Sequence, residues 1–200
     1  MSKILIIPDI HGKIDALKQG LAEGVSKEVD KIVLLGDLAD SWSASNDDIM
    51  ECFETAKYAC EFAPDKIEWL IGNHELHYMF TDERCSGYRP DLAAQLTPWL
   101  MENKRFLKVA YQEGNHLFTH AGIQNKWVVK HDAVIRDRIT KENGLASALN
   151  ELFQTHYRSV LTEVGVKRGG MRYDYGGPFW CDKEEMESYG PLKGYHQYVG

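Results

Sequence analysis

The sequence has few cysteines, no long apolar run and no paired-cysteine motif. No stretch approaches the ~18 apolar residues that a membrane span requires, and the N-terminal aliphatic run is too short for the core of a signal peptide. None of the four cysteines belongs to a Cys-x-x-Cys pair: Cys52, Cys60, Cys85 and Cys181. Such wide spacing is typical of reduced thiols in a cytosolic protein. We therefore expect a cytoplasmic protein without a membrane partner.

Basic charge is also scarce. The 200 residues include 23 basic and 30 acidic side chains, which gives a formal net charge of −7. An acidic chain argues against nucleic acid as a partner, because non-specific binding normally needs a basic face. It is compatible with an anionic substrate, since bound cations reverse the charge of a site locally. The length favours one domain over residues 1–200 that buries about 70% of the surface of the unfolded chain.

Short aliphatic runs alternate with amphipathic segments in the first half of the chain. Strands are predicted at residues 4–7, 32–35 and 67–71, followed by loops at 8–12, 36–45 and 72–75. Apolar residues at helical spacing predict helices over 14–25, 49–60 and 92–100. Ser45 or Asn46 is the expected N-cap of the second helix. This alternation predicts an α/β fold with a largely parallel sheet.

The second half of the chain predicts a different sheet. Residues 107–111 and 116–119 flank Glu113-Gly114-Asn115, which indicates a hairpin, so the sheet is expected to become mixed. A long helical stretch is expected next, with apolar residues from Leu145 to Phe153 and then His156 on one side. Residues 165–180 are rich in glycine and aromatic residues and predict an irregular loop. A last strand is predicted at 195–199.

Residue types that bind metals repeatedly follow the predicted strands. The carboxyl ends of strands in an open α/β sheet are where ligand sites assemble, so these loops can converge on one crevice. Aspartate, histidine and asparagine form a mixed oxygen and nitrogen donor set, which suits Mn²⁺, Fe or Zn²⁺ better than Ca²⁺. The residues concerned are Asp9, His11, Asp37, Asp40, Asn73, His74, Glu75 and His120.

The spacing of these residues resembles that of the calcineurin-like metallophosphoesterases, within them the phosphoprotein-phosphatase branch that includes small bacterial and phage enzymes. The resemblance implies a β-sandwich of mixed sheets flanked by helices, and a centre of two divalent metal ions, Mn²⁺ or else Fe or Zn²⁺. The matching motifs, in the family's order, are Asp9-x-His11-Gly12, Gly36-Asp37-x-x-Asp40, Gly72-Asn73-His74-Glu75 and His120-Ala121-Gly122.

The resemblance also assigns roles to the matching residues. It implies that a hydroxide between the two metals attacks phosphorus, which agrees with the lowered pKa of metal-bound water. It makes His74 the proton donor to the leaving group, oriented by Asp40, and a carboxylate beside a histidine does favour the imidazolium. The implied metal ligands are Asp9 and His11 for the first ion, Asp37 as the bridge, and Asn73 with His120 for the second ion.

The expected reaction is therefore hydrolysis of a phosphate ester, with a phosphoprotein, a nucleotide or a small phosphomonoester as substrate. Glu75 is interpreted as structural or as a support for the ligands. Four further histidines belong to no motif and are interpreted as surface or satisfied core residues: His77, His116, His131 and His156.

Two departures from the family pattern concern phosphate binding. Ser41 stands where the branch has an arginine, and Trp180-Cys181-Asp182 places a carboxylate where a second arginine is usual. Arginine pairs bind phosphate strongly, so the substrate-binding residues stay unknown. The alternatives are a phosphodiesterase or nuclease on the same scaffold, or a catalytically silent binding module. Substitute cations could be Arg84, Arg89, Arg168 or Arg172.

The third departure lies at residues 196–200. The family's last ligand motif is an aliphatic strand that ends in Gly-His, and the segment from His196 to Gly200 looks like that strand stopped one residue before the histidine. We expect a fragment that lacks the last strands of the domain. His196 is a weak candidate for the missing ligand, because side chains alternate along a strand.

Overall fold

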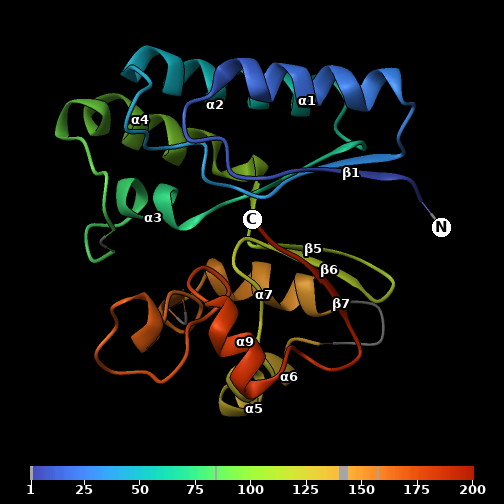
Figure 1. The fold of residues 1–200 in the computed structure, drawn as a ribbon, viewed down its shortest axis with the longest axis vertical. Helices are drawn as coiled ribbons and strands as arrows, with labels where there is room; N and C mark the ends of the chain where they lie inside the picture. The colour runs from blue at the N-terminus through green and yellow to red at the C-terminus, as the bar shows by residue number, and fades with distance from the viewer. Residues whose placement is uncertain (1, 84, 140–143, 157) are drawn as a thin grey trace. The chain divides into compact units, whose positions relative to one another are not determined.

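The computed structural model contains two β-sheets, each within its own part of the chain (Figure 1). It describes residues 2–83, 85–139, 144–156 and 158–200. The chain divides into two compact units, Met1–Lys108 and Val109–Gly200. The predicted mixed α/β class is confirmed. The single domain over residues 1–200 and the sandwich of the two sheets stay predictions.

The first unit is built on a parallel sheet. Its strands are β1 (Ile4–Ile7), β2 (Lys31–Leu34), β3 (Ile67–Leu70) and β4 (Leu107–Lys108), in that spatial order. The predicted parallel arrangement is confirmed. The prediction that residues 107–111 form one hairpin arm is partly wrong, since the first two of them extend this sheet by pairing in parallel with β3. A parallel sheet gathers the loops after its strands at one edge.

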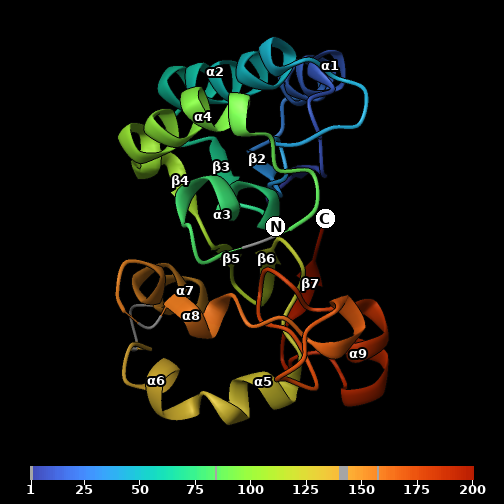
Figure 2. The same ribbon diagram turned by 90° about the vertical axis from the view of Figure 1, so that its left-hand side faces the viewer.

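The helices of the first unit are α1 (Ile14–Ser26), α2 (Asn46–Phe62), α3 (Asn73–Met79) and α4 (Pro90–Asn103), with a 3-10 turn η1 (Lys104–Phe106). Figures 1 and 2 show α1 and α2 together on one side of the sheet. The aliphatic faces of these helices pack there because the strands of a parallel sheet are apolar on both faces.

The predicted start of α2 is confirmed in detail. The Ser45 side chain accepts from the backbone N–H of Asp48, and the Asp48 carboxylate accepts from the N–H of Ser45. This reciprocal capping box satisfies two donors that the first turn leaves free. The apolar spacing that predicts the helix over 14–25 ends at Val25, but Val25 is exposed, and the buried residue at this end of α1 is Gly24, which lies against Ile32.

The loop predicted over residues 72–75 is wrong, because α3 begins at Asn73. Glu75 is the third residue of this helix, and its carboxylate accepts from the backbone N–H of Gly72 at 2.7 Å. This contact caps the first turn from within. The Asn-His-Glu motif therefore lies on the first turn of a helix, directly after β3, instead of in irregular backbone.

The second unit holds a three-stranded mixed sheet of β5 (Ala110–Glu113), β6 (His116–Thr119) and β7 (His196–Tyr198). β5 and β6 form the predicted antiparallel hairpin, and β7 pairs in parallel with β6. The predicted change to a mixed sheet and the predicted last strand are both confirmed.

The long helical stretch predicted for this unit is wrong. The described residues form short helices instead, and α7 ends before His156 because the chain turns at Gln154, whose N–H donates to the carbonyl of Glu151. Residues 140–143 lie outside the described part. The irregular character of residues 165–180 is confirmed. The helical segments are α5 (Asn125–Lys130), α6 (Asp132–Arg136), α7 (Leu145–Phe153), α8 (Arg158–Leu161), η2 (Val166–Arg168) and α9 (Lys183–Tyr189).

Two further predictions concern the whole chain. All four cysteines carry free thiols, as their spacing predicted. Within the described residues, no helix has both the length and the apolar character that crossing a bilayer demands.

Candidate active site

The loops that follow β1 and β2 are joined by backbone hydrogen bonds. The N–H groups of Ile10 and His11 donate to the carbonyl of Asp37 at 3.1 and 2.8 Å, and the N–H of Gly12 donates to the carbonyl of Leu38 at 3.0 Å. These bonds satisfy buried backbone groups that no strand or helix would otherwise pair. The first two sequence motifs therefore form one interlocked piece of backbone.

Glu75 joins the third motif to the second. Its side chain is fully buried, and its two oxygens accept from the N–H groups of Asp37 and Ala39, both at 2.9 Å, in addition to that of Gly72. A buried carboxylate is tolerated when several donors compensate its charge. These contacts explain the structural role of Glu75, because this one side chain fixes the loop after β2 against the loop after β3.

The backbone itself is unusual at the predicted site. Four non-glycine residues among those described have positive φ, and three of them belong to the motifs: His11 at 47°, Asp37 at 51° and Asp40 at 54°. Such conformations cost about 1–3 kcal/mol each and persist only where the surroundings enforce them. Close packing enforces one of them, since a Cβ atom on Gly72 would lie 2.1 Å from Oδ1 of Asp37.

His11 and Asp37 are arranged as two ligands of one cation would be. Nδ1 of His11 lies 3.0 Å from the carbonyl oxygen of Ala39 and 2.9 Å from that of Asp40. Carbonyl oxygens only accept, so Nδ1 carries the proton and the lone pair of the neutral ring is on Nε2. That atom lies 3.8 Å from Oδ2 of Asp37, too far for a hydrogen bond.

A separation of 3.8 Å suits a shared cation. Two ligands held ~2.1 Å from one metal ion lie about 3–4 Å apart. A ligand atom of Asp9 also comes within 4.8 Å of one of Asp37. His11 and Asp37 therefore fit a divalent metal at this point, with an imidazole and a carboxylate as donors, and Asp9 is a second carboxylate close to Asp37.

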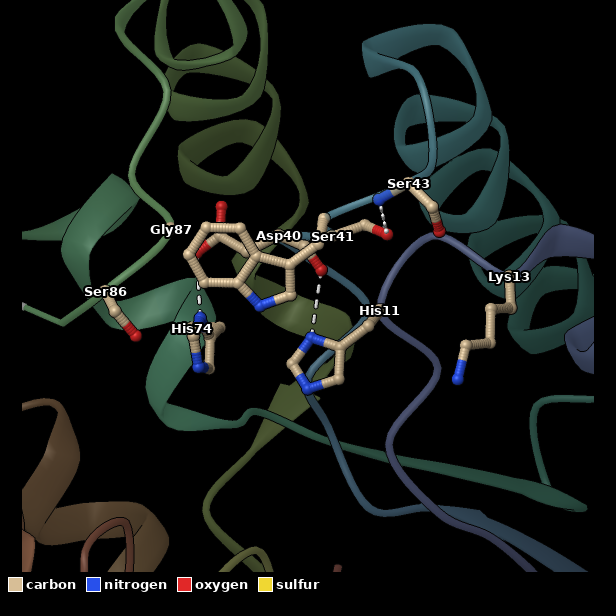
Figure 3. A pocket seen from close by; sticks show the side chains of 9 residues that line it. His11, Lys13, Asp40, Ser41, Ser43, His74, Ser86 and Gly87 are labelled. Carbon is tan, nitrogen blue, oxygen red and sulfur yellow. Dashed lines mark hydrogen bonds and ion pairs between the residues drawn. The ribbon is translucent and has the colours of Figure 1, made fainter.

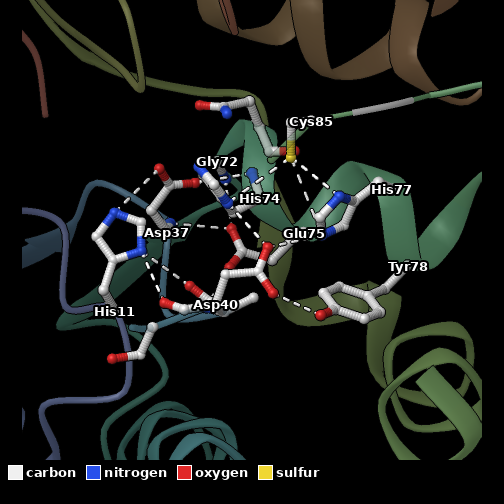
Figure 4. Close-up of polar contacts among 12 residues, drawn as sticks. His11, Asp37, Asp40, Gly72, His74, Glu75, His77, Tyr78 and Cys85 are labelled. Atoms are coloured by element: carbon white, nitrogen blue, oxygen red, sulfur yellow. Dashed lines mark hydrogen bonds and ion pairs between the residues drawn. The ribbon is translucent and has the colours of Figure 1, made fainter. Parts of the chain in front are cut away.

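His74 and Asp40 form a second, adjoining arrangement (Figure 4). Nδ1 of His74 lies 2.8 Å from Oδ2 of Asp40, and the backbone N–H of His74 donates to Oδ1 of Asp37 at 2.9 Å. The imidazole of His74 stands edge-on to that of His11, with ring centroids 5.0 Å apart. A carboxylate on Nδ1 fixes the orientation of the ring and leaves Nε2 to act on another group.

Sequence reasoning missed three residues that contact this pair. Nε2 of His77 lies 2.7 Å from Oδ2 of Asp40, the Tyr78 hydroxyl donates to its Oδ1, and Cys85 Sγ lies 3.0 Å from Nδ1 of His77. The interpretation of His77 as a satisfied core residue holds, but its partner is Asp40. Positions 74, 77 and 78 share one face of α3. Helical spacing counted from His74 could therefore have indicated His77 and Tyr78.

These contacts shift the pKa values of the cluster. Burial lowers the pKa of His74, but its hydrogen bonds to Asp40 and Cys85 and the charge of Asp37 outweigh burial and raise it to about 11. Burial likewise opposes the hydrogen bonds of His77, whose pKa rises to about 9. For Asp40, burial raises the pKa, but hydrogen bonds from His74, His77 and Tyr78 hold it well below its usual range. The carboxylate of Asp40 therefore favours the protonated form of both imidazoles.

A cavity of about 280 Å³ opens beside this cluster (Figure 3). Its walls combine the two site histidines with hydroxyl groups, one lysine and an aromatic ring. The Trp42 side chain is 92% exposed, so its ring is available to a ligand. The residues that line the cavity are His11, Lys13, Asp40, Ser41, Trp42, Ser43, His74, Ser86 and Gly87.

Two candidate phosphate-binding arginines have structural partners instead. Arg89 donates to the carbonyls of Ser41 and Ala44 and to Oδ1 of Asn46, so it holds the loop that follows Asp40. Arg168 pairs with Asp182 at 2.8 Å. Arg84 lies outside the described residues.

The remaining predicted residues lie in, or directly beside, helices and strands of their own units. Asn73 is the first residue of α3. In the second unit, Asp182 is the N-cap of α9, where its side chain accepts from the N–H of Glu184. His120 is buried directly after β6 in the same unit. Ligand roles for Asn73 and His120 stay predictions.

Fold and site together define a mixed α/β protein with carboxylate and imidazole donors at the ends of its parallel strands. The family model for calcineurin-like phosphoesterases matches residues 2–189. The chain therefore belongs to the calcineurin-like phosphoesterase family. No curated protein sequence matches the chain significantly.

Solved structures give weaker similarities. A metallophosphoesterase from Sphaerobacter thermophilus matches at 22% identity and a TM-score of 0.38, over 64% of this chain and 53% of its own. A protein serine/threonine phosphatase from Saccharomyces cerevisiae matches at 21% identity and a TM-score of 0.35, over 61% of this chain and 38% of its own. The matches thus cover about half of the first protein and less than half of the second.

Proposed function

We propose that this chain hydrolyses phosphate esters in the manner of a serine/threonine phosphatase. The proposed reaction uses two divalent cations, for which Mn²⁺ is the first candidate. The observation that carries the proposal is the His74–Asp40 pair at 2.8 Å, next to His11 and Asp37 at a separation that suits a cation. When bound, the cations would supply positive charge for the phosphate oxygens and an activated water. Asp9, His11 and Asp37 would hold the first ion, with Asp37, Asn73 and His120 holding the second.

His74 is the proposed general acid. Asp40 holds its ring through Nδ1, which leaves Nε2 to donate a proton to the oxygen of the departing alcohol. A donor works best with a pKa near the operating pH, and cations bound at Asp37 and His11 would lower the raised pKa of His74 by repulsion. The imidazolium is then poised to lose its proton to the leaving group.

The cavity supports the proposed substrates. Its volume of about 280 Å³ admits a phosphorylated side chain, a nucleotide phosphate or a small phosphomonoester. Lys13 supplies a cationic group to the phosphate oxygens, and the exposed ring of Trp42 offers an apolar face to the rest of the molecule. A cytoplasmic location belongs to the same proposal and is supported by the four free thiols.

Leaving-group dependence tests this role. We expect Mn²⁺-dependent hydrolysis of phenyl phosphate and p-nitrophenyl phosphate by the wild-type chain. The variant His74→Asn should lose about 10²–10⁴-fold in kcat on phenyl phosphate, and much less on p-nitrophenyl phosphate, because nitrophenolate departs without protonation.

The matched control is His116→Gln, which removes a histidine that contacts the Tyr198 hydroxyl in the second unit. It should keep wild-type kcat on both substrates. Equal losses of His74→Asn on the two esters would remove the acid role, and a wild-type chain inert with Mn²⁺ would overturn the proposed function.

A phosphodiesterase is the second candidate. One observation favours it: Ser41 occupies the position of the family's arginine, and nearby Arg89 is engaged by the backbone of that loop. A diester carries one negative charge fewer than a monoester and needs fewer cationic partners. The ratio of kcat/KM for bis(p-nitrophenyl) phosphate to that for p-nitrophenyl phosphate separates the two, and a ratio above one supports the diester.

A further inference from the structure

Four side chains of metal-binding types come together at Asp40, His74, His77 and Cys85, and the family motifs include two of them. His74 and His77 are one helical turn apart on α3, Asp40 comes from the loop after β2, and Cys85 comes from the loop after α3. One ligand atom from each of the four lies within 4.8 Å of the others. Figure 4 shows the sulfur and both imidazoles turned toward one another.

The distances within this group suit one small cation. Oδ2 of Asp40 lies 2.8 Å from Nδ1 of His74, and Sγ of Cys85 lies 3.7 Å from that nitrogen and 3.0 Å from Nδ1 of His77. Tetrahedral zinc holds nitrogen and oxygen at ~2.0–2.1 Å and sulfur at ~2.3 Å, which places neighbouring ligands about 3.3–3.6 Å apart. Shifts of about half an ångström, together with a turn of the His77 ring that takes its Nε2 away from Asp40, produce that geometry.

The surroundings support the same ligands. Asp40 and His77 are almost fully buried, and the Tyr78 hydroxyl donates to Oδ1 of Asp40, which keeps Oδ2 turned toward the histidines. Metal sites commonly have such a partner behind a carboxylate ligand. Access is provided by the cavity, since Asp40 and His74 line it.

We propose that Asp40, His74, His77 and Cys85 form a binding site for one Zn²⁺ ion, distinct from the cations that His11 and Asp37 would hold. The thiolate is what separates the two sites, because sulfur selects Zn²⁺ over Mn²⁺ or Mg²⁺. Zinc on Nδ1 of His74 replaces the hydrogen bond to Asp40. Bound Zn²⁺ therefore inhibits hydrolysis, a consequence that rests on the proposed function, whereas the binding itself does not.

Cobalt gives a direct readout of this site. Co²⁺ added to chelator-treated protein should produce a thiolate-to-cobalt absorption band in the near ultraviolet that saturates at one equivalent. The band identifies this site, because the ligands predicted for the other cations include no cysteine. Added Zn²⁺ should abolish the band by displacement.

Three variants make the test specific. Cys85→Ser should lose the band, His77→Asn should bind Co²⁺ at least about tenfold more weakly, and Cys181→Ser should match the wild type, because Cys181 is a buried cysteine of the second unit. A wild-type protein without the band, or a band that survives in Cys85→Ser, overturns the proposal.

The inhibition is measured separately. With saturating Mn²⁺, Zn²⁺ should reduce wild-type hydrolysis of phenyl phosphate, and Cys85→Ser should need at least about tenfold more Zn²⁺ for the same fractional loss. Equal sensitivity of the two overturns the inhibitory role. If no variant hydrolyses the ester, the proposed function fails, while the cobalt band still decides the zinc site.

Discussion

Each unit of the molecule buries a carboxylate against histidine, and the two arrangements differ in what surrounds the imidazole. In the first unit, Asp40 accepts from His74 and His77. In the second, Glu163 accepts from His131 at 2.9 Å and from the ammonium of Lys130 at 2.8 and 3.0 Å. Both carboxylates are almost fully buried, and for both the hydrogen bonds outweigh burial and lower the pKa.

The difference lies in where the imidazoles face. His74 lines a cavity, whereas the ring of His131 packs against Trp127 at 5.2 Å between centroids. The charge of Glu163 is compensated by Lys130, which also lies 4.1 Å from the centre of the Tyr173 ring. A buried carboxylate–histidine pair thus becomes a candidate site when its imidazole faces a cavity. Otherwise it is a structural ion pair.

The largest expected difference between the two units is in the reactivity of their cysteines. Burial raises the pKa of Cys181 to about 12. Burial acts the same way on Cys85, but hydrogen bonds and charge from His74 and His77 outweigh it and lower the pKa below its usual value. The thiolate fractions near pH 7.5 should therefore differ by about 10³-fold or more.

We expect iodoacetamide to modify Cys85 long before Cys181, as followed by mass spectrometry of the folded protein. Replacing His77 by asparagine should slow the reaction of Cys85 and leave that of Cys181 unchanged. Comparable rates for the two wild-type thiols would mean that the histidines do not activate Cys85, and the contrast between the units would lose its electrostatic basis.

Matched substitutions of the two carboxylates should separate their roles in hydrolysis. Asp40→Asn keeps the shape of the side chain but removes the charge that orients His74, so kcat for phenyl phosphate should fall by about 10–100-fold. Glu163→Gln should change kcat by less than about twofold, because the partners of Glu163 are His131 and Lys130 of the second unit. Both are measured at saturating Mn²⁺, and similar losses in the two variants would contradict the distinction.

The sequence predicted most of the first unit because its signals are local. Aliphatic runs marked β1, β2 and β3 to within one residue, and the capping residue Ser45 marked the start of α2. The polar residues after each strand then indicated a site, because a parallel sheet brings the loops after its strands together. The long helix of the second unit failed, because tertiary packing there divides a continuous helical pattern into short segments.

Parts of the candidate site could not be predicted from local sequence patterns. The position of Glu75 in the third motif was evident, but its bonds to the backbone of Asp37 and Ala39 join segments far apart in the chain. Cys85 belongs to no motif, and its approach to His77 depends on how the loop after α3 returns. Such contacts follow from the fold, so residue spacing alone could not indicate them.

The smallest expected effect concerns the stability of the second unit's ion pair. Because the pKa of Glu163 is lowered in the folded chain, the carboxylate stabilises the fold fully above its ordinary pKa of about 4.3. That contribution is lost as the pH falls through the lower, folded-state pKa. Glu163→Gln should therefore reduce the free energy of unfolding by about 1–2 kcal/mol at pH 7, a value discounted because the Lys130 side chain is 34% exposed.

Urea unfolding at pH 7, 5 and 3 measures this difference, which should persist at pH 5 and shrink at pH 3. The control is Glu187→Gln, which removes an exposed partner of Lys183 at 3.7 Å and should cost less than about 0.5 kcal/mol at every pH. A Glu163→Gln penalty that stays constant down to pH 3 would show that the carboxylate contributes through its hydrogen bonds alone. The charge of Lys130 would then not account for the stability of this cluster, and the cavity that His74 lines would remain as the feature that separates Asp40 from it.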